Sequence, residues 1–111
     1  MLENRKHPRR QITSPIAFQI EDGPLLEAES RDISLGGMFI TTTESTPYGA
    51  AIRVYINLPG MKRETVIDCV VRWNTGEGMG VHFGRMGALE THALTLLLSG
   101  VTAEEPPASR Y

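Results

Sequence analysis

The sequence has little that would support several familiar classes of protein. A single cysteine, Cys69, among 111 residues excludes an intrachain disulfide, and with it a disulfide-stabilised secreted scaffold. No apolar run approaches the ~20 residues that a membrane-spanning helix needs. No apolar segment follows the charged first residues, as it would in a secretory signal. We therefore expect a cytoplasmic protein without membrane insertion.

The net charge is also small, and the sequence shows no metal-ligand spacing. The formal net charge is −2, so the whole molecule matches neither nucleic acid nor an anionic membrane, and we expect neither as a partner. The histidines, His7, His82 and His92, show no metal-ligand spacing, and no G-x-S-x-G pattern surrounds Ser34. We therefore expect no catalytic residue, no metal and no cofactor, and any anion site must be local.

What the chain does have, between residues 14 and 84, is a series of short β-prone runs separated by turn residues. The clearest run spans residues 52–58. Apolar residues occupy every second position in it, so they share one face of the predicted strand. Residues 65–73 alternate in the same way and put Trp73 on one face with Cys69 and Val71, which favours a core position for Trp73 and Cys69. The other runs cover residues 15–20, 25–32, 38–42 and 79–83. About six strands with short connections predict an antiparallel barrel or sandwich.

The two ends of the chain follow different patterns. In residues 88–98 the period changes, and Leu89, Ala93, Leu96 and Leu97 recur at helical spacing, so we expect a short amphipathic helix. It could cover the barrel or pair with a second copy, and the protein is expected to be a monomer or weak dimer. Residues 1–13 form a polar, basic arm, and residues 101–111 a proline-rich tail that we expect to be disordered. One domain then covers residues 14–100.

One candidate site is the basic arm, which places Arg5, Lys6, Arg9 and Arg10 within six residues of an acidic protein. The planar guanidinium of arginine can donate two parallel hydrogen bonds to phosphate oxygens, and it can stack on a nucleobase. Taken alone, the arm is better explained as a solvated basic segment, and short basic segments also bind nucleic acid.

A second candidate is the turn Asp32-Ile33-Ser34-Leu35-Gly36-Gly37. An ionised Asp32 can accept from the N–H donors along the Watson–Crick edge of guanine, and the Ser34 hydroxyl can donate or accept. Gly37 lets a ligand approach the backbone closely. The structural alternative is a tight turn in which Asp32 and Ser34 bond nearby backbone amides.

Taken together, the two segments resemble the paired signature of PilZ domains. Arg5-x-x-x-Arg9 is followed about twenty residues later by Asp32-x-Ser34-x-x-Gly37, and the runs DISLGGMFI, VVRW and GMGVHF are also similar to that family. The resemblance extends from Arg5 to about Leu98. It implies a six-stranded antiparallel, split or Greek-key-like barrel with a C-terminal helix, which binds the bacterial second messenger cyclic di-GMP.

The resemblance also implies roles for particular residues. Arg5 and Arg9 would bind phosphate and guanine faces, with help from Arg10. Asp32 and Ser34 would read a guanine edge, while Gly37 leaves space. Trp73 stands where some members have an aromatic residue near the ligand, although its alternation favours the core. Many members that bind two nucleotides have another arginine at the position of Asn4, so its absence favours one ligand per site.

The function implied is that of a cyclic di-GMP receptor that catalyses nothing itself. In this interpretation the arm becomes ordered on nucleotide binding and signals to an effector protein in motility, biofilm formation or pilus assembly. The alternative is a PilZ-fold adaptor for motility or type IV pili that binds a protein without nucleotide. Such relatives usually lack the signature arginines, so Arg5 and Arg9 favour the receptor.

Overall fold

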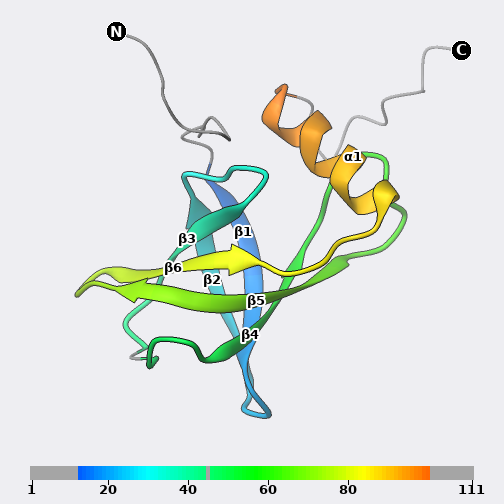
Figure 1. The fold of residues 1–111 in the computed structure, drawn as a ribbon. Coiled ribbons are helices and arrows are strands. Elements are labelled where there is room, and N and C mark those ends of the chain that lie inside the picture. Colours follow the sequence, from blue (N-terminus) through cyan, green and yellow to red (C-terminus); the bar gives the residue numbers. More distant parts are fainter. Residues whose placement is uncertain (1–12, 45, 101–111) are drawn as a thin grey trace, which may run out of the picture.

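The computed structural model describes residues 13–44 and 46–100, which form six strands and one helix. The strands close into an antiparallel barrel in the order β1-β2-β3-β6-β5-β4, and the helix follows the last strand (Figure 1). Their bounds are β1 Ser14–Ile20, β2 Leu25–Arg31, β3 Gly37–Thr41, β4 Ala51–Ile56, β5 Thr65–Asn74, β6 Gly78–Phe83 and α1 Ala88–Leu98. The predicted barrel with a C-terminal helix is confirmed. The predicted arm, apart from Thr13, and the predicted tail lie outside the described residues.

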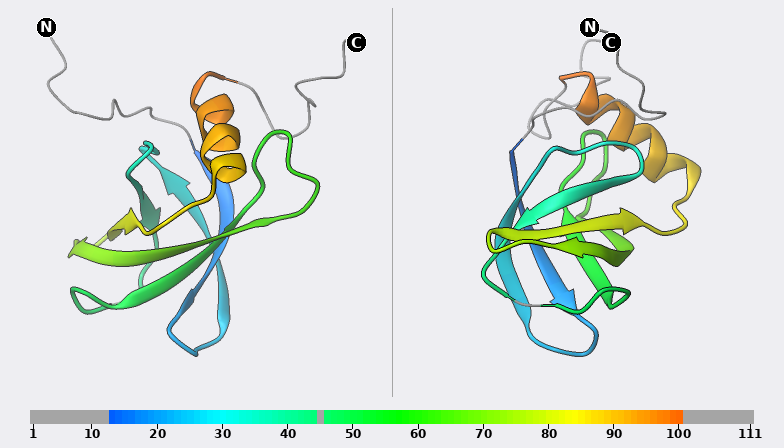
Figure 2. Two further views of the ribbon diagram at one scale, coloured as in Figure 1. Left: turned by 45° about the vertical axis from the view of Figure 1, so that its right-hand side comes forward. Right: turned by 60° about the vertical axis from the view of Figure 1, so that its left-hand side comes forward.

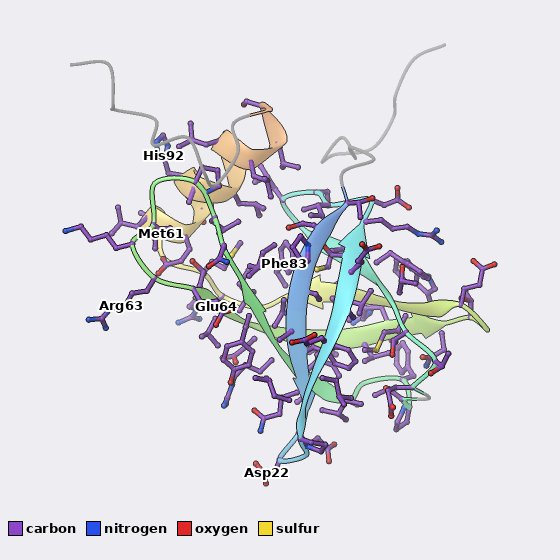
Figure 3. The ribbon with its side chains drawn as sticks, turned by 180° about the vertical axis from the view of Figure 1, so that it is seen from behind. Asp22, Met61, Arg63, Glu64, Phe83 and His92 are labelled. Atoms are coloured by element: carbon purple, nitrogen blue, oxygen red, sulfur yellow. The ribbon has the colours of Figure 1, made fainter. Side chains whose placement is uncertain are left out.

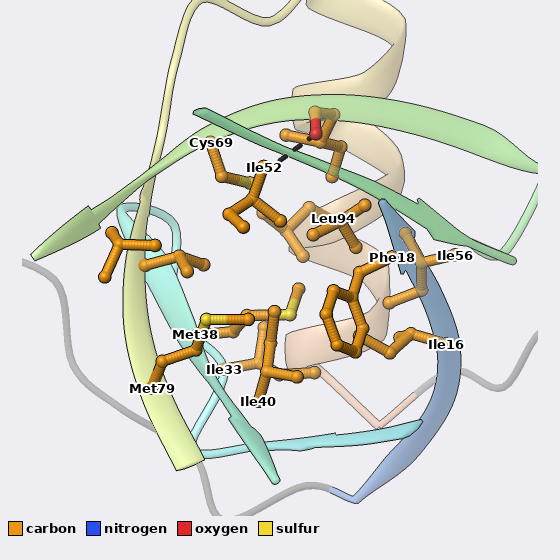
Figure 4. Packing of buried hydrophobic residues seen from close by; sticks show 14 of the residues in the cluster. Ile16, Phe18, Ile33, Met38, Ile40, Ile52, Ile56, Cys69, Met79 and Leu94 are labelled. Carbon is orange, nitrogen blue, oxygen red and sulfur yellow. Dashed lines mark hydrogen bonds between the residues drawn. The ribbon is translucent and has the colours of Figure 1, made fainter. Parts of the chain in front are cut away.

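The strands turn alternate side chains into the barrel, as their period of two predicts. In β4, Ile52, Val54 and Ile56 are at most 2% exposed, whereas the intervening Arg53 lies in solvent. The inward residues of β1, β3, β4, β5 and β6 form one buried cluster that includes the fully buried Phe18 (Figure 4), and Leu26 and Ala28 of β2 pack against it. The alternation therefore predicted most of the core correctly.

Helix α1 closes one end of the barrel, and the turn between β1 and β2 lies at the opposite end (Figure 2). His92 on the helix and Asp22 in that turn mark these two ends (Figure 3). The side chain of Leu94 is completely buried and joins the barrel core (Figure 4). The expectation that the helix covers the barrel is thus confirmed for this chain.

The predicted face of the helix was partly wrong. Ala93 and Leu94 are buried and Leu97 packs against the core, but Leu89 is 72% exposed. The helix contains four leucines among residues 94–98, so more than one apolar face can be drawn at a spacing of three and four. Only the way the helix meets the barrel decides which face is buried.

Cys69 lies on the inner face of β5 and is 2% exposed, as its place in an apolar run predicted. Burial raises the pKa of its thiol to about 12, and the neighbouring Asp68 carboxylate acts in the same direction. The thiol therefore stays protonated at neutral pH and behaves as a small apolar side chain.

Within residues 13–44 and 46–100, no helix is long and apolar enough to cross a membrane. The same residues contain no cluster of three or more His, Cys, Asp or Glu side chains that could hold a metal ion.

Candidate functional site

The turn between β2 and β3 is built around one buried residue. Ile33 is completely buried in the barrel core and anchors the turn from below. The backbone N–H of Ser34 donates to the carbonyl of Gly37 at 2.9 Å, and the Ser34 hydroxyl accepts from the N–H of Gly36 at 3.1 Å. Ser34 therefore has the turn-forming role that the structural alternative predicted.

Asp32 differs from Ser34 in this respect. Its φ of 53° lies in the left-handed region, where aspartate is tolerated better than most residues other than glycine. Its side chain is half-buried, and its carboxylate makes no hydrogen bond or ion pair with any residue in the described part of the chain. A carboxylate in such a position retains its full capacity to accept hydrogen bonds.

Gly37 is required by the sheet itself. It pairs with His82 of β6, and a Cβ at this position would overlap the carbonyl oxygen of Val81. Because the Val81 oxygen belongs to the backbone of a paired strand, it cannot move aside cheaply. The close approach of β3 and β6 thus explains this glycine without any ligand.

The predicted core position of Trp73 was wrong. The β5–β6 register pairs Val71 with Val81 but Trp73 with Gly80, so Arg72 is an extra residue in a β-bulge. The bulge reverses the alternation and turns Trp73 to the outer face, where its side chain is 43% exposed. A one-residue shift moves every following side chain to the other face of a strand.

On the outer face, Trp73 lies flat against β6. A Cβ at Gly80 would overlap its ring, so the glycine provides the space that the indole occupies. The ring of His82 meets the indole edge-on, with the ring centroids 6.4 Å apart. His82 is exposed.

Trp73 is one end of a row of residues that crosses four strands on the outside of the barrel. Arg31 pairs with Phe39, Phe39 with Gly80, and Gly80 with Trp73. We call these four residues the outer row; three strand spacings give it a width of ~14 Å. The guanidinium carbon of Arg31 lies 4.6 Å from the centre of the Phe39 ring. The row therefore presents the Arg31 cation and the Trp73 ring to one surface, while the Phe39 ring is covered by Arg31 and is only 9% exposed.

The structure brings several of the predicted site residues together. Asp32 follows Arg31 directly, and Gly37 is paired with His82, which contacts Trp73. Asp32, Gly37 and Trp73 therefore border the same side of strands β2, β3, β6 and β5. The predicted residues Arg5, Arg9 and Arg10 lie outside the described residues.

Arg31 and Phe39 were not predicted as site residues from the sequence. The available signal was the alternation of the run 37–41, in which Met38 and Ile40 point inward and Phe39 must point outward. The Phe39 ring lies on the outer face of the barrel, where the guanidinium of Arg31 covers it and leaves it 9% exposed.

A second feature, at the β1–β2 end of the barrel, is a cleft of about 360 Å³. Its lining residues are Glu21, Asp22, Ala51, Ile52, Arg53, Asp68 and Cys69. Three carboxylates face a single guanidinium there, and Arg53 is already paired with Asp68 at 3.5 Å. This balance of charge disfavours an anionic ligand in the cleft.

Comparison with known proteins decides the family. The model of the PilZ domain matches residues 3–99. The chain belongs to the PilZ family. PilZ domains are binding and effector modules, and their pattern accounts for both the barrel and the signature segments found here.

Solved structures show the same fold. The Bacillus subtilis inhibitor of motility, MotI/DgrA, superposes with a TM-score of 0.68 at 22% identity, over 89% of this chain and 52% of that one. This PilZ chain thus spans about half the length of that protein. The PilZ domain of CeSA from a cellulose-synthesizing bacterium gives 0.65 at 15% identity, over 83% and 95% of the two chains. No curated protein sequence matches the chain.

Proposed function

We propose that this PilZ protein is a receptor for cyclic di-GMP, which binds across the outer row beside the Asp32–Gly37 turn. The observation that carries the proposal is the placement of Asp32 and Trp73. The former is a carboxylate with unused acceptors, and the latter is an aromatic ring turned outward by a bulge. A guanine base needs both kinds of partner, one at its edge and one at its face.

Each member of the site has a chemical task in this proposal. The Asp32 carboxylate accepts from the N1–H and N2–H₂ groups of one guanine, and Trp73 stacks on a base. Arg5 and Arg9, assisted by Arg10, bring permanent positive charge to the two phosphates and to the guanine faces. Ser34 supports the turn and offers its hydroxyl, and Asn4 in place of another arginine favours one nucleotide per site.

Nucleotide binding would order the arm over the barrel. Each charge-assisted hydrogen bond contributes ~1.5–3 kcal/mol, whereas fixing the backbone of one residue costs ~1–2 kcal/mol. The arginine contacts therefore offset part of the cost of ordering the arm, and the contacts of the bases with Asp32 and Trp73 add to the binding free energy. The ordered arm and the ligand together form a new surface for a protein partner.

One structural neighbour is an inhibitor of motility, so components of the motility apparatus are the first partners to test. If the protein acts as a nucleotide-independent adaptor instead, partner binding will not respond to cyclic di-GMP.

Isothermal titration calorimetry tests the nucleotide site. Cyclic di-GMP should bind the wild-type protein, and Arg9→Ala and Asp32→Asn should each weaken binding by about tenfold or more, because each removes a charge-assisted contact. Arg63→Ala is the matched control, since Arg63 lies in the β4–β5 connection and points into solvent (Figure 3). Unchanged affinity in both site variants would overturn the assignment.

Ionic strength gives an independent check. Contacts between arginine and phosphate at a surface are screened by salt, so the affinity should fall steadily as the salt concentration rises. An affinity that does not depend on salt would contradict the role of the arm in binding phosphate.

A further inference from the structure

Arg31 is held in an unusual position for an exposed arginine. Its guanidinium lies over the Phe39 ring, 4.6 Å from the centroid, and its Nη2 atom lies 3.5 Å from a carboxylate oxygen of Glu77. Glu77 stands in the turn between β5 and β6, and its carbonyl accepts the backbone N–H of Thr42 at 3.1 Å. Three separate elements therefore meet at this one side chain.

The contact with Glu77 leaves most of the guanidinium available. A separation of 3.5 Å through a single nitrogen is a loose ion pair, and the two side chains are 47% and 80% exposed. Pairs of this kind contribute little to folding stability because both charges remain solvated. A phosphate carries its charge on several oxygens and can accept two parallel hydrogen bonds from the same guanidinium, so it can displace Glu77.

We infer that Arg31 is a further ligand-binding residue of this site, which clamps a phosphate of the nucleotide, and that Glu77 competes with that phosphate for Arg31. This inference rests on the proposed function. Arg31 precedes Asp32 in the chain and begins the outer row, so a ligand that engages Asp32 and reaches toward Trp73 lies within its range. The Phe39 ring lies under the guanidinium and helps to hold it at this surface.

The alternative is that Arg31 and Glu77 only tie the β5–β6 turn to the barrel. The protein contains a matched pair that distinguishes these interpretations. Arg53 on β4 and Asp68 on β5 are also separated by 3.5 Å, and their side chains are 54% and 81% exposed. This pair has the same chemistry and exposure but belongs to the acidic cleft rather than to the outer row.

A double-mutant cycle measured by calorimetry with cyclic di-GMP tests the inference. Arg31→Gln should weaken binding by about tenfold, and Glu77→Gln should tighten it by about two- to fivefold, because the competing carboxylate is gone. In the Arg31→Gln background, Glu77→Gln should have no effect on affinity, since its influence acts through Arg31. The controls Arg53→Gln and Asp68→Asn should leave the affinity unchanged.

The outcomes separate this inference from the proposed function. If the wild-type protein does not bind cyclic di-GMP, the proposed function fails, and this inference fails with it. If the wild-type protein binds but Arg31→Gln binds equally well, only the role of Arg31 is overturned. If Glu77→Gln still tightens binding without Arg31, the carboxylate acts through its general field, and the competition is overturned. Melting temperatures without nucleotide should show that all variants are folded.

Discussion

The two faces of β3 and β6 are built by different rules. The inner face carries apolar side chains that are at most 3% exposed: Met38, Ile40, Met79 and Val81. The outer face carries an aromatic ring, an imidazole and closely packed glycines: Phe39, His82, Gly78 and Gly80. The inner face depends only on alternation and volume, whereas the outer face depends on where particular glycines and one bulge lie. The inner face should therefore contribute most of the stability, and the outer face is the one that we propose for recognition.

The largest effect is expected where the helix joins the inner face. Leu94→Ala should lower the free energy of unfolding by ~2–5 kcal/mol, because it leaves a cavity where the helix closes the barrel. Leu89→Ala, in the same helix, should change it by no more than ~0.5 kcal/mol, since that side chain is exposed. Urea denaturation of both variants measures these changes in the free energy of unfolding. Equal losses would contradict the observed orientation of the helix.

The next effect concerns Gly37, which belongs to the signature segment but serves the sheet. Gly37→Ala should cost ~1–3 kcal/mol of stability, because the new methyl group meets the Val81 carbonyl. Gly76→Ala is the control, as a methyl group there meets open space. Thermal unfolding of both variants without nucleotide should show the difference. If Gly37→Ala is as stable as the wild-type protein, this glycine serves the ligand instead.

Because Cys69 is buried on the inner face of β5, the free energy of unfolding should fall at alkaline pH. The pKa of Cys69 is about 12 in the folded protein, whereas its ordinary value is 9.0. Between these two pH values the thiol is ionised in the unfolded protein but stays protonated in the folded protein. This contribution to stability is fully present below pH 9 and is lost between pH 9 and 12.

At pH 10 this loss amounts to about 1 kcal/mol relative to pH 8. Cys69→Ala should lack that part of the decline, so the stability of the two proteins should converge as pH rises. The comparison removes the contributions of other titrating groups, which both proteins share. Parallel stability curves for the two proteins would show that the thiol is more accessible to water than its 2% exposure indicates.

How far the sequence could predict this molecule follows from the same contrast. The strands and the core were predictable because alternation recurs along each strand, and the signature residues Asp32 and Ser34 were recognisable from their order and spacing. The position of Trp73 was not, because a bulge at Arg72 leaves no trace in an alternating run until the partner strand is known. The outward role of Leu89 was missed because neighbouring leucines offered several faces. The ion pair of Arg31 with Glu77 joins residues 46 positions apart, which no local pattern indicates.

The smallest effect on stability, and the most informative about the outer face, is expected at Gly80. Gly80→Ala places a methyl group where the Trp73 ring lies, and the ring can move because its side chain is exposed. The cost should be ~1 kcal/mol, at the low end for an added methyl group, because the exposed ring rather than the backbone moves aside. Trp73 is the single tryptophan, so its displacement should appear directly as a red-shifted fluorescence emission.

If the displaced indole can no longer stack on a base, Gly80→Ala should also weaken cyclic di-GMP binding by about as much as Trp73→Ala does, near tenfold. The two substitutions should not add in the double variant, since both remove the same contact. Additive losses would mean that Gly80 contacts the ligand through its own backbone. A displaced indole with unchanged affinity would remove Trp73 from the site, and the outer row would then end at β6.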